Sequence, residues 1–293
     1  MHRKILAAAA VAMGLVIAAP STAIAAPSTA VAPTAVRYVA LGDSFTSGPL
    51  VPTQVDLNCL RSNRNYPSLL ASALGAASFK DVSCAGATTN DILNPGTGQL
   101  NRPVPAQLSA VTPDTTLVTV GIGGNDIGFS SIMTTCAEES LGSPLGSPCR
   151  DRYTSGGTDQ LQERIAATAP KIANVLRAVR AAAPNARVVV LGYVTLLPDS
   201  GLGCWPVVPI AYGDVSYLRG IHRSLNAMLA NTAAANGAEY IDVYTPSIGR
   251  DACKGSSTRW TEPLIPGNSA APLHPNAAGE QGMANVILAA LRA

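Results

Sequence analysis

Aromatic and charged residues are scarce in this sequence, at 4% and 13% of its 293 positions, and only three histidines occur. Few aromatic rings leave little surface for stacking sugars. The 20 basic residues nearly balance the 18 acidic ones, so nothing predicts binding to nucleic acid. No H-E-x-x-H motif is present and no two cysteines have C-x-x-C spacing, so neither a metal site nor a cofactor is predicted.

The amino terminus has the pattern of an export signal. Arg3 and Lys4 precede an apolar run over residues 5–18, and Ala23-Ile24-Ala25 supplies the small residues of a cleavage site. This run of about 14 residues is shorter than the roughly 20 that span a membrane, and no later stretch is long and apolar enough. We predict a signal peptide over residues 1–25, a flexible leader over 26–35 and a secreted domain over 36–293. Removing Arg3 and Lys4 from the 20 basic residues leaves 18 against 18 acidic ones, a nearly neutral mature chain.

Strand-like apolar runs alternate with segments of helical periodicity. The strands are predicted at Val36–Leu41, Phe79–Ser83, Leu117–Gly121, Arg187–Tyr193 and Glu239–Val243, and the helices at Pro67–Leu74, Gln160–Ala183, Val215–Ala235 and Asn276–Leu291. This alternation predicts an α/β fold in which helices cover both faces of a parallel sheet. In such sheets, sites form at the carboxyl ends of the strands.

Four long stretches show no clear period, at residues 48–64, 137–157, 196–213 and 245–273. Loops longer than about 15 residues in a compact domain are usually functional or disordered. Each of these stretches contains a cysteine, so we predict ordered loops that shape a substrate site. The six cysteines favour three disulfides in an exported chain, and 15 pairings are possible.

Two histidines remain after removal of the signal peptide, and their settings differ. His222 lies inside a predicted helix, where a histidine on a helix face is the simpler interpretation. His274 lies between a long loop and the last predicted helix, followed by Pro275, so its side chain is free to face a cleft. We therefore predict that His274 is the general base.

Three loops that follow predicted strands carry residues suited to acyl transfer. Ser44 comes directly after the first strand, in Gly42-Asp43-Ser44, although the G-x-S-x-G motif of ordinary α/β-hydrolases is absent. Gly86 follows the second strand, and glycines after the third strand free the backbone to present the Asn125 amide. Asp126 is interpreted as a helix cap or loop brace. Ser44 could itself belong to a simple capping turn, but the other two loops favour a nucleophile.

These residues together resemble the SGNH hydrolases, also called GDSL lipases and esterases. Four blocks match in order: Gly42-Asp43-Ser44, Gly86, Gly124-Asn125-Asp126 and His274, and the resemblance covers Val36 to Ala293. It implies a three-layer flavodoxin-like fold with a five-stranded sheet, Ser44 as nucleophile, and an oxyanion hole of the Ser44 and Gly86 N–H groups and the Asn125 side chain. The similarity to the secreted actinobacterial branch implies the disulfides Cys59–Cys84, Cys136–Cys149 and Cys204–Cys253.

One position departs from the family pattern. Most members have an aspartate three residues before the histidine, and this chain has Ala271 there. The resemblance implies a Ser-His dyad in which a backbone carbonyl of residues 270–272 orients His274. Glu262 or Asp251, brought back by the long loop, is the alternative partner. With a carbonyl partner, replacement of Glu262 is expected to have little effect.

Substrate class follows less directly. Apolar residues in two loops suggest a wall for an acyl chain: Leu50, Val51, Pro52, Leu196, Leu197, Trp205, Val207, Val208 and Ile210. Packing of the loops themselves explains these residues equally well. We predict a monomeric carboxylic ester hydrolase acting on fatty-acyl esters, with acetylated carbohydrates or phospholipids as alternative substrates. A secreted binding protein without activity is the rival from another class.

Overall fold

The structure is a computed structural model that describes residues 1–2, 8–10, 12, 14 and 35–293. The chain divides into two units, Met1–Thr34 and Ala35–Ala293. The predicted signal peptide and leader lie almost entirely outside the described residues, so both remain predictions. All helices and strands given below belong to the second unit.

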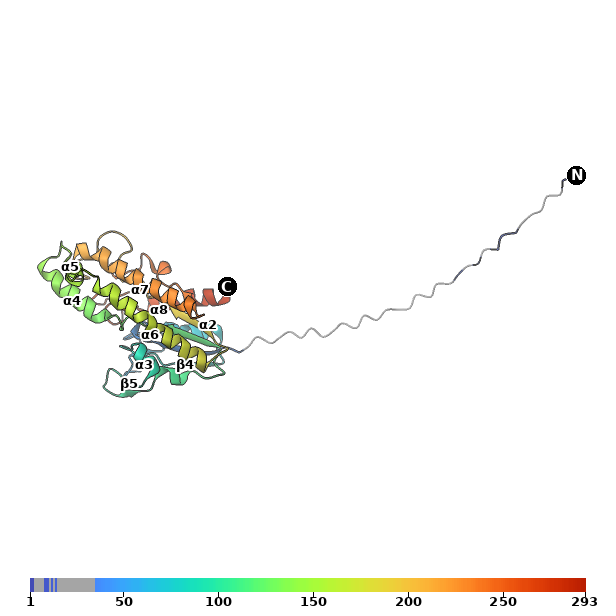
Figure 1. Ribbon diagram of the computed structural model, residues 1–293, viewed down its shortest axis with the longest axis horizontal. Coiled ribbons are helices and arrows are strands. Elements are labelled where there is room, and N and C mark those ends of the chain that lie inside the picture. The colour runs from blue at the N-terminus through green and yellow to red at the C-terminus, as the bar shows by residue number, and fades with distance from the viewer. Residues whose placement is uncertain (3–7, 11, 13, 15–34) are drawn as a thin grey trace. The chain divides into compact units, whose positions relative to one another are not determined.

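A five-stranded parallel sheet forms the centre of this unit, in the order β4-β1-β7-β8-β9 (Figure 1). Its strands are β1 (Arg37–Gly42), β4 (Ser78–Asp81), β7 (Leu117–Gly121), β8 (Arg187–Leu191) and β9 (Glu239–Ile241). The predicted α/β fold is thus confirmed, and the strand ends differ from expectation by at most two residues. The register pairs Gly42 with Gly121, so the loops after β1 and β7 begin side by side.

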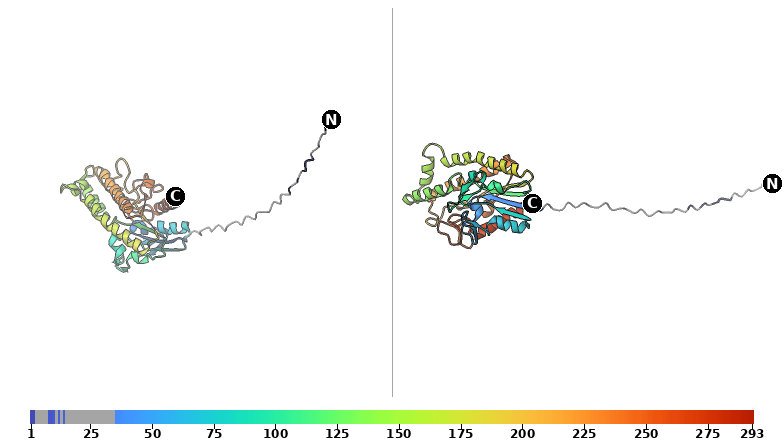
Figure 2. Two further views of the ribbon diagram at one scale, coloured as in Figure 1. Left: turned by 45° about the vertical axis from the view of Figure 1, so that its right-hand side comes forward. Right: turned by 90° about the horizontal axis from the view of Figure 1, so that it is seen from below.

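Helices cover both faces of the sheet. Figure 2 shows α6 (Gln160–Ala182) and α7 (Val215–Ala235) on one face, and α2 (Tyr66–Leu74) and α8 (Ala277–Arg292) on the other. Every residue of β7 is buried, as expected for a central strand covered on both sides. Asp159 precedes α6 and caps it with its side chain, and α6 buries an apolar face at helical spacing.

The prediction of an irregular stretch over residues 137–157 is wrong. α4 (Phe129–Gly142) and α5 (Pro148–Thr154) occupy most of it. The helical signal is weak because α4 buries only four side chains, Ile132, Met133, Cys136 and Ser140, and many of its other residues are polar. The remaining elements are short: α1 (Ser44–Ser47), α3 (Thr89–Leu93), the pairs β2 (Gln54–Asp56) with β3 (Arg61–Ser62) and β5 (Gly96–Thr97) with β6 (Pro103–Val104), and 3-10 turns at Gln107–Ala110, Tyr212–Asp214 and Thr245–Ser247.

The six cysteines pair in sequence order, as the family resemblance implied. Cys59–Cys84 joins the loop after β2 to the loop after β4, and Cys136–Cys149 joins α4 to α5. Cys204–Cys253 joins the long stretches that follow β8 and β9. These loops near the ends of the strands are therefore covalently constrained. In the part of the chain that the structure describes, no helix combines the length and the apolar character needed to cross a membrane.

Two helical glycines differ in their surroundings and allow a matched test. A Cβ at Gly282 in α8 would overlap the Trp260 ring, whereas a Cβ at Gly220 in α7 would meet nothing within 4 Å. Gly282→Ala should lower the free energy of unfolding by about 1–3 kcal/mol through overpacking. Gly220→Ala should raise it by roughly 0.5–1 kcal/mol, because alanine is the better helix former. Urea unfolding followed by circular dichroism measures both values, and equal effects would contradict the packing of α8 on Trp260.

Candidate active site

The strand β1 ends in a tight turn that leads into α1. The Asp43 side chain accepts a hydrogen bond from the Phe45 N–H at 2.9 Å and caps this helix. A Cβ at Gly42 would overlap the Thr46 hydroxyl, so only glycine fits between strand and helix. Ser44 is the first residue of α1 and is half-buried. Its N–H has no acceptor within the helix, because the first turn of a helix leaves these groups free.

His274 lies next to Ser44 at the same edge of the sheet. Its Nε2 is 2.7 Å from Ser44 Oγ, although 230 positions separate the two residues in the chain. Its Nδ1 is 2.7 Å from the carbonyl oxygen of Pro272, which belongs to the segment predicted to orient it. With its proton on Nδ1, the imidazole donates to Pro272 and turns the Nε2 lone pair toward the serine hydroxyl.

Neither acidic alternative approaches the His274 ring. Asp251 is buried and accepts from the Cys253 N–H at 3.0 Å. The Glu262 carboxylate is bound by other side chains, and only its backbone N–H contacts His274, at the carbonyl oxygen and 2.9 Å away. No side-chain carboxylate within the described residues is hydrogen-bonded to the imidazole.

Glu262 instead anchors the loop that carries His274. The Arg259 guanidinium donates to its two oxygens at 3.0 and 2.6 Å, and the side-chain amides of Asn268 and Asn276 donate at 2.8 and 2.6 Å. Burial raises the pKa of the Glu262 carboxyl, but these hydrogen bonds outweigh burial and bring the pKa down to about 2. The expectation that Glu262 can be replaced with little effect is therefore revised, because its loss would leave the Arg259 guanidinium buried and unpaired.

Aromatic rings surround the imidazole. The ring centroids of Phe45 and Phe129 lie 4.9 and 6.4 Å from that of His274. Burial lowers the pKa of the His274 imidazole below its ordinary value, and the hydrogen bond to the Pro272 carbonyl opposes this change. The ring is therefore neutral at neutral pH and able to accept a proton.

The two other predicted loops converge on the same edge of the sheet. Gly86, after β4, has φ +85° and is exposed. Asn125, after β7, donates from its side-chain amide to the Ala87 carbonyl at 2.8 Å, which joins the two loops. Within the described residues, neither the Ser44 N–H nor the Gly86 N–H donates a hydrogen bond. Both groups are thus free to bind an oxygen.

Asp126 braces these loops, as predicted from the sequence. Its two oxygens accept hydrogen bonds from the Thr89 N–H at 2.9 Å and the Thr89 hydroxyl at 2.6 Å. The carboxylate therefore holds the start of α3 against the loop after β7 and does not face the His274 ring.

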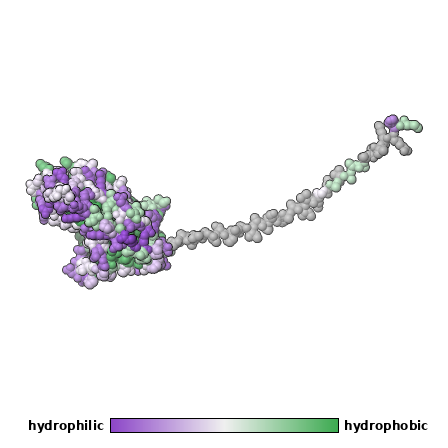
Figure 3. All heavy atoms as spheres, in the orientation of Figure 1, coloured by the Kyte–Doolittle hydropathy of each residue, from purple (hydrophilic) through white to green (hydrophobic). Residues whose placement is uncertain are grey.

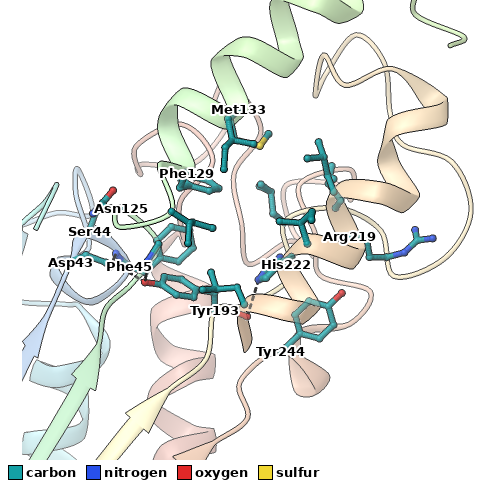
Figure 4. Close-up of a pocket in the computed structure, with 18 residues that line it drawn as sticks. Asp43, Ser44, Phe45, Asn125, Phe129, Met133, Tyr193, Arg219, His222 and Tyr244 are labelled. Atoms are coloured by element: carbon teal, nitrogen blue, oxygen red, sulfur yellow. Dashed lines mark hydrogen bonds between the residues drawn. The ribbon is translucent and has the colours of Figure 1, made fainter. Parts of the chain in front are cut away.

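An apolar cavity opens beside Ser44 (Figure 4). Side chains of α4 and α7 form a large part of its wall, and Phe129 and Met133 point into it from α4. The loop residues expected to form this wall contribute only Leu196 and Leu197. The face of the molecule in Figure 3 has polar residues interspersed with smaller apolar areas. The apolar surface of the cavity differs from these areas because it is concave. Its apolar lining comprises Phe45, Ile127, Phe129, Ile132, Met133, Leu196, Leu197, Leu218, Ile221 and Leu225.

His222 lies on α7, as predicted, but it also lines this cavity. Its Nε2 is 3.3 Å from the Tyr193 carbonyl oxygen, and its ring packs edge-on against Tyr244. Burial lowers the pKa of His222 to about 4, so it is a neutral part of the wall. Among the described residues, no group of three or more histidine, cysteine or acidic side chains is placed to hold a metal ion.

Comparison with known proteins agrees with this geometry. Residues 40–281 match the profile of the GDSL-like lipase/acylhydrolase family. The chain belongs to this family. It is 40% identical to Lipase 2 of Streptomyces coelicolor over 96% of this chain and 95% of that protein. This GDSL family member is therefore a carboxylic ester hydrolase.

Two solved structures resemble this GDSL hydrolase closely in fold. Phospholipase A1 from Streptomyces albidoflavus superposes with a TM-score of 0.72 and 32% identity, over 88% of this chain and 100% of that one. An extracellular lipase from Streptomyces rimosus superposes with a TM-score of 0.71 and 31% identity, over 87% and 100%. The five-stranded α/β architecture is therefore shared with lipolytic enzymes across nearly the whole folded unit.

The surroundings of His274 predict its titration. Burial without a carboxylate partner should place the imidazole pKa below the ordinary value of 6.5. As pH falls, the base should therefore stay neutral to below pH 6.5 and be lost only at lower pH. Imidazole ¹⁵N chemical shifts measured against pH report this value, with a His222→Gln variant to assign the two rings. A pKa above 6.5 would indicate a carboxylate that stabilises the charged ring and would contradict the dyad.

Proposed function

We propose that this GDSL hydrolase is a secreted esterase or lipase that cleaves fatty-acyl esters, with Ser44 as nucleophile and His274 as general base. The single observation that carries the proposal is the 2.7 Å contact between Ser44 Oγ and His274 Nε2 beside an apolar cavity. A serine becomes a nucleophile when an oriented base can take its proton. The cavity supplies the place for an acyl chain.

The reaction proceeds in two halves. Ser44 Oγ attacks the ester carbonyl carbon while His274 Nε2 takes the hydroxyl proton, and the carbonyl oxygen becomes an oxyanion. Collapse of this intermediate breaks the ester bond, and His274 gives its proton to the leaving alcohol. Water, deprotonated by His274, then attacks the acyl-enzyme; the bond to Ser44 Oγ breaks, His274 returns the proton to this oxygen, and the acid leaves. The Pro272 carbonyl holds the Nδ1 proton throughout, with a partial charge instead of the full charge of an aspartate.

Three donors are proposed to stabilise the oxyanion. They are the N–H groups of Ser44 and Gly86, which donate to no other described group, and the side-chain amide of Asn125. The Asn125 amide donates to Ala87 in this structure, which fixes its orientation. Donors of this kind act because they are already in place when the charge develops.

The cavity favours a fatty-acyl group over an acetyl group. Its lining is mainly aliphatic and aromatic, whereas an acetyl group needs little apolar surface. The alcohol part of the substrate could belong to a simple ester, a glyceride or a phospholipid, and the likeness to a phospholipase A1 keeps the last in consideration. Acetylated carbohydrate is disfavoured by the same apolar lining.

Secretion and a monomeric state complete the proposal. The three disulfides suit an oxidising environment outside the cytosol, and the similar Streptomyces rimosus enzyme is an extracellular lipase. One chain supplies both Ser44 and His274 together with the cavity, so a second copy is not needed to complete the site.

A fluorophosphonate probe tests the nucleophile. We expect wild-type protein to be labelled and to hydrolyse p-nitrophenyl butyrate, and Ser44→Ala to lose both properties. Ser131→Ala, which removes an exposed serine of α4, is the control and should keep both. Absence of labelling in folded wild-type protein would favour a binding protein without activity, and labelling of Ser44→Ala would place the nucleophile elsewhere.

A substitution in α4 tests the acyl cavity. Met133→Trp should fill part of the cavity and lower kcat/KM for p-nitrophenyl decanoate at least about 10-fold relative to the butyrate. Leu141→Trp is the control, because Leu141 lies on the same helix but is 72% exposed and does not line the cavity. It should leave the ratio of the two substrates unchanged. An unchanged ratio in Met133→Trp would show that the acyl chain binds elsewhere.

A further inference from the structure

One buried hydroxyl connects three of the loops at the active edge of the sheet. Tyr193 follows β8, and its Oη donates to Asp43 Oδ2 at 2.6 Å. The same oxygen accepts a hydrogen bond from the Gly124 N–H at 2.7 Å. Asp43 immediately precedes Ser44, and Gly124 immediately precedes Asn125. The hydroxyl therefore links the turn of the nucleophile to the loop of the Asn125 amide.

We propose that Tyr193 is a positioning residue that sets the place of Ser44 relative to Asn125, and thereby the geometry of the oxyanion hole. The proposal rests on the proposed function, because it concerns the same nucleophile and the same oxyanion donors. Strand order supports it: β1, β7 and β8 are consecutive neighbours in the sheet, so the loop after β7 lies between the other two.

The hydrogen bonds of this hydroxyl suit both of its partners. A backbone N–H only donates, so Gly124 requires an acceptor, and the Asp43 carboxylate in its ionised form only accepts, so that form requires a donor. A hydroxyl meets both needs with a single atom. The other Asp43 oxygen accepts from the Phe45 N–H, so the carboxylate ties Tyr193 to α1 itself. No other described side chain donates to Asp43.

The backbone of Tyr193 is itself held in place. The Asn226 side chain of α7 accepts from the Tyr193 N–H at 2.8 Å and donates to the Tyr193 carbonyl at 3.0 Å. The Tyr193 ring packs edge-on against Phe45, with ring centroids 5.1 Å apart. A Cβ at Gly124 would come within 3.0 Å of the hydroxyl, so the contact with the loop is close. Hydrogen bonds through Tyr193 thus connect α7 to the loop of Ser44 and to the loop of Asn125.

The environment makes the bridge costly to break. Asp43 and Tyr193 are both buried, and burial raises the pKa of the Asp43 carboxyl to about 7 while the hydrogen bond from Tyr193 opposes this. Removal of the hydroxyl would leave the Gly124 N–H and one Asp43 oxygen buried without partners. The loop that carries Asn125 is then expected to shift to find new partners. Oxyanion stabilisation depends on donor positions within tenths of an ångström, so a small shift lowers the rate.

Tyr193→Phe keeps the ring that lines the cavity and removes only the hydroxyl. We expect kcat for p-nitrophenyl butyrate to fall about 10-fold or more, with KM within about twofold of wild type, because ground-state binding is kept and transition-state binding is not. Removal of a whole oxyanion donor lowers kcat roughly 10²- to 10³-fold, so the fall in kcat for Tyr193→Phe should not exceed this range. Benzeneboronic acid adds to the serine oxygen as a tetrahedral adduct, and its Ki should rise by a factor similar to the fall in kcat.

The matched control is Tyr38→Phe. Tyr38 is as deeply buried and its hydroxyl pairs with Thr119 in the sheet, away from the site. We expect this variant to lose thermal stability while kcat and the boronate Ki remain at wild-type values. Equal loss of kcat in both variants would show a general effect of destabilisation and overturn the proposal.

The remaining outcomes separate this inference from the proposed function. A Tyr193→Phe variant with kcat within twofold of wild type, beside an inactive Ser44→Ala, would overturn the positioning role alone. A raised KM with unchanged kcat would also overturn it, because the hydroxyl would then act on the bound substrate. Turnover by Ser44→Ala would overturn both proposals.

Discussion

The hydrogen bond between His274 and Ser44 joins residues from near the two ends of the folded unit, and the activity proposed for this protein depends on it. Ser44 directly follows the tight turn between β1 and α1, whereas His274 belongs to a long loop without regular structure. The loop reaches the serine because the buried Glu262 carboxylate gathers Arg259 and two asparagine amides around it. Removal of one partner of this buried ion pair would be costly, because the other charge would remain buried without a partner.

The parallel sheet explains why one edge collects all the chemistry. Four of its five strands end near residues of the site: Ser44 follows β1, Gly86 follows β4, Asn125 follows β7 and Tyr193 follows β8. Parallel strands present their carboxyl ends at the same edge of the sheet, so residues far apart in sequence become neighbours there. Hydrogen bonds between the loops then form a second level of organisation, which positions the site residues relative to one another more finely than the sheet can. The contacts of Asn125 with Ala87 and of Tyr193 with Asp43 and Gly124 belong to this second level.

Much of the fold and part of the site could be predicted because they depend on local patterns. Buried strands appear as short apolar runs, and α6, α7 and α8 appear as periodic segments, of which α6 and α8 also have capping residues. The sequence does not predict α4, because its buried side chains are few and many of its other residues are polar. The apolar loop residues are explained from the sequence equally well by a cavity wall or by packing of the loops. Leu196 and Leu197 line the cavity beside residues of α4 and α7, whereas Val208 and Ile210 pack into the core. A one-dimensional pattern cannot tell whether an apolar face meets the core or a cavity, since both exclude water.

The sequence by itself determined the order of the elements, the six cysteines, and the types of residue able to carry acyl transfer, because these depend on the identity and spacing of neighbouring residues. It also has Ala271 three residues before His274, where most family members have an aspartate, so a carboxylate at that position cannot be the partner of His274. Tertiary structure alone decided the partner that replaces it, the Pro272 carbonyl, because a carbonyl is present at every residue and only its direction matters. The roles of Glu262 and Tyr193 were likewise decided in three dimensions: a buried carboxylate or hydroxyl acts through the donors and acceptors that the fold brings to it.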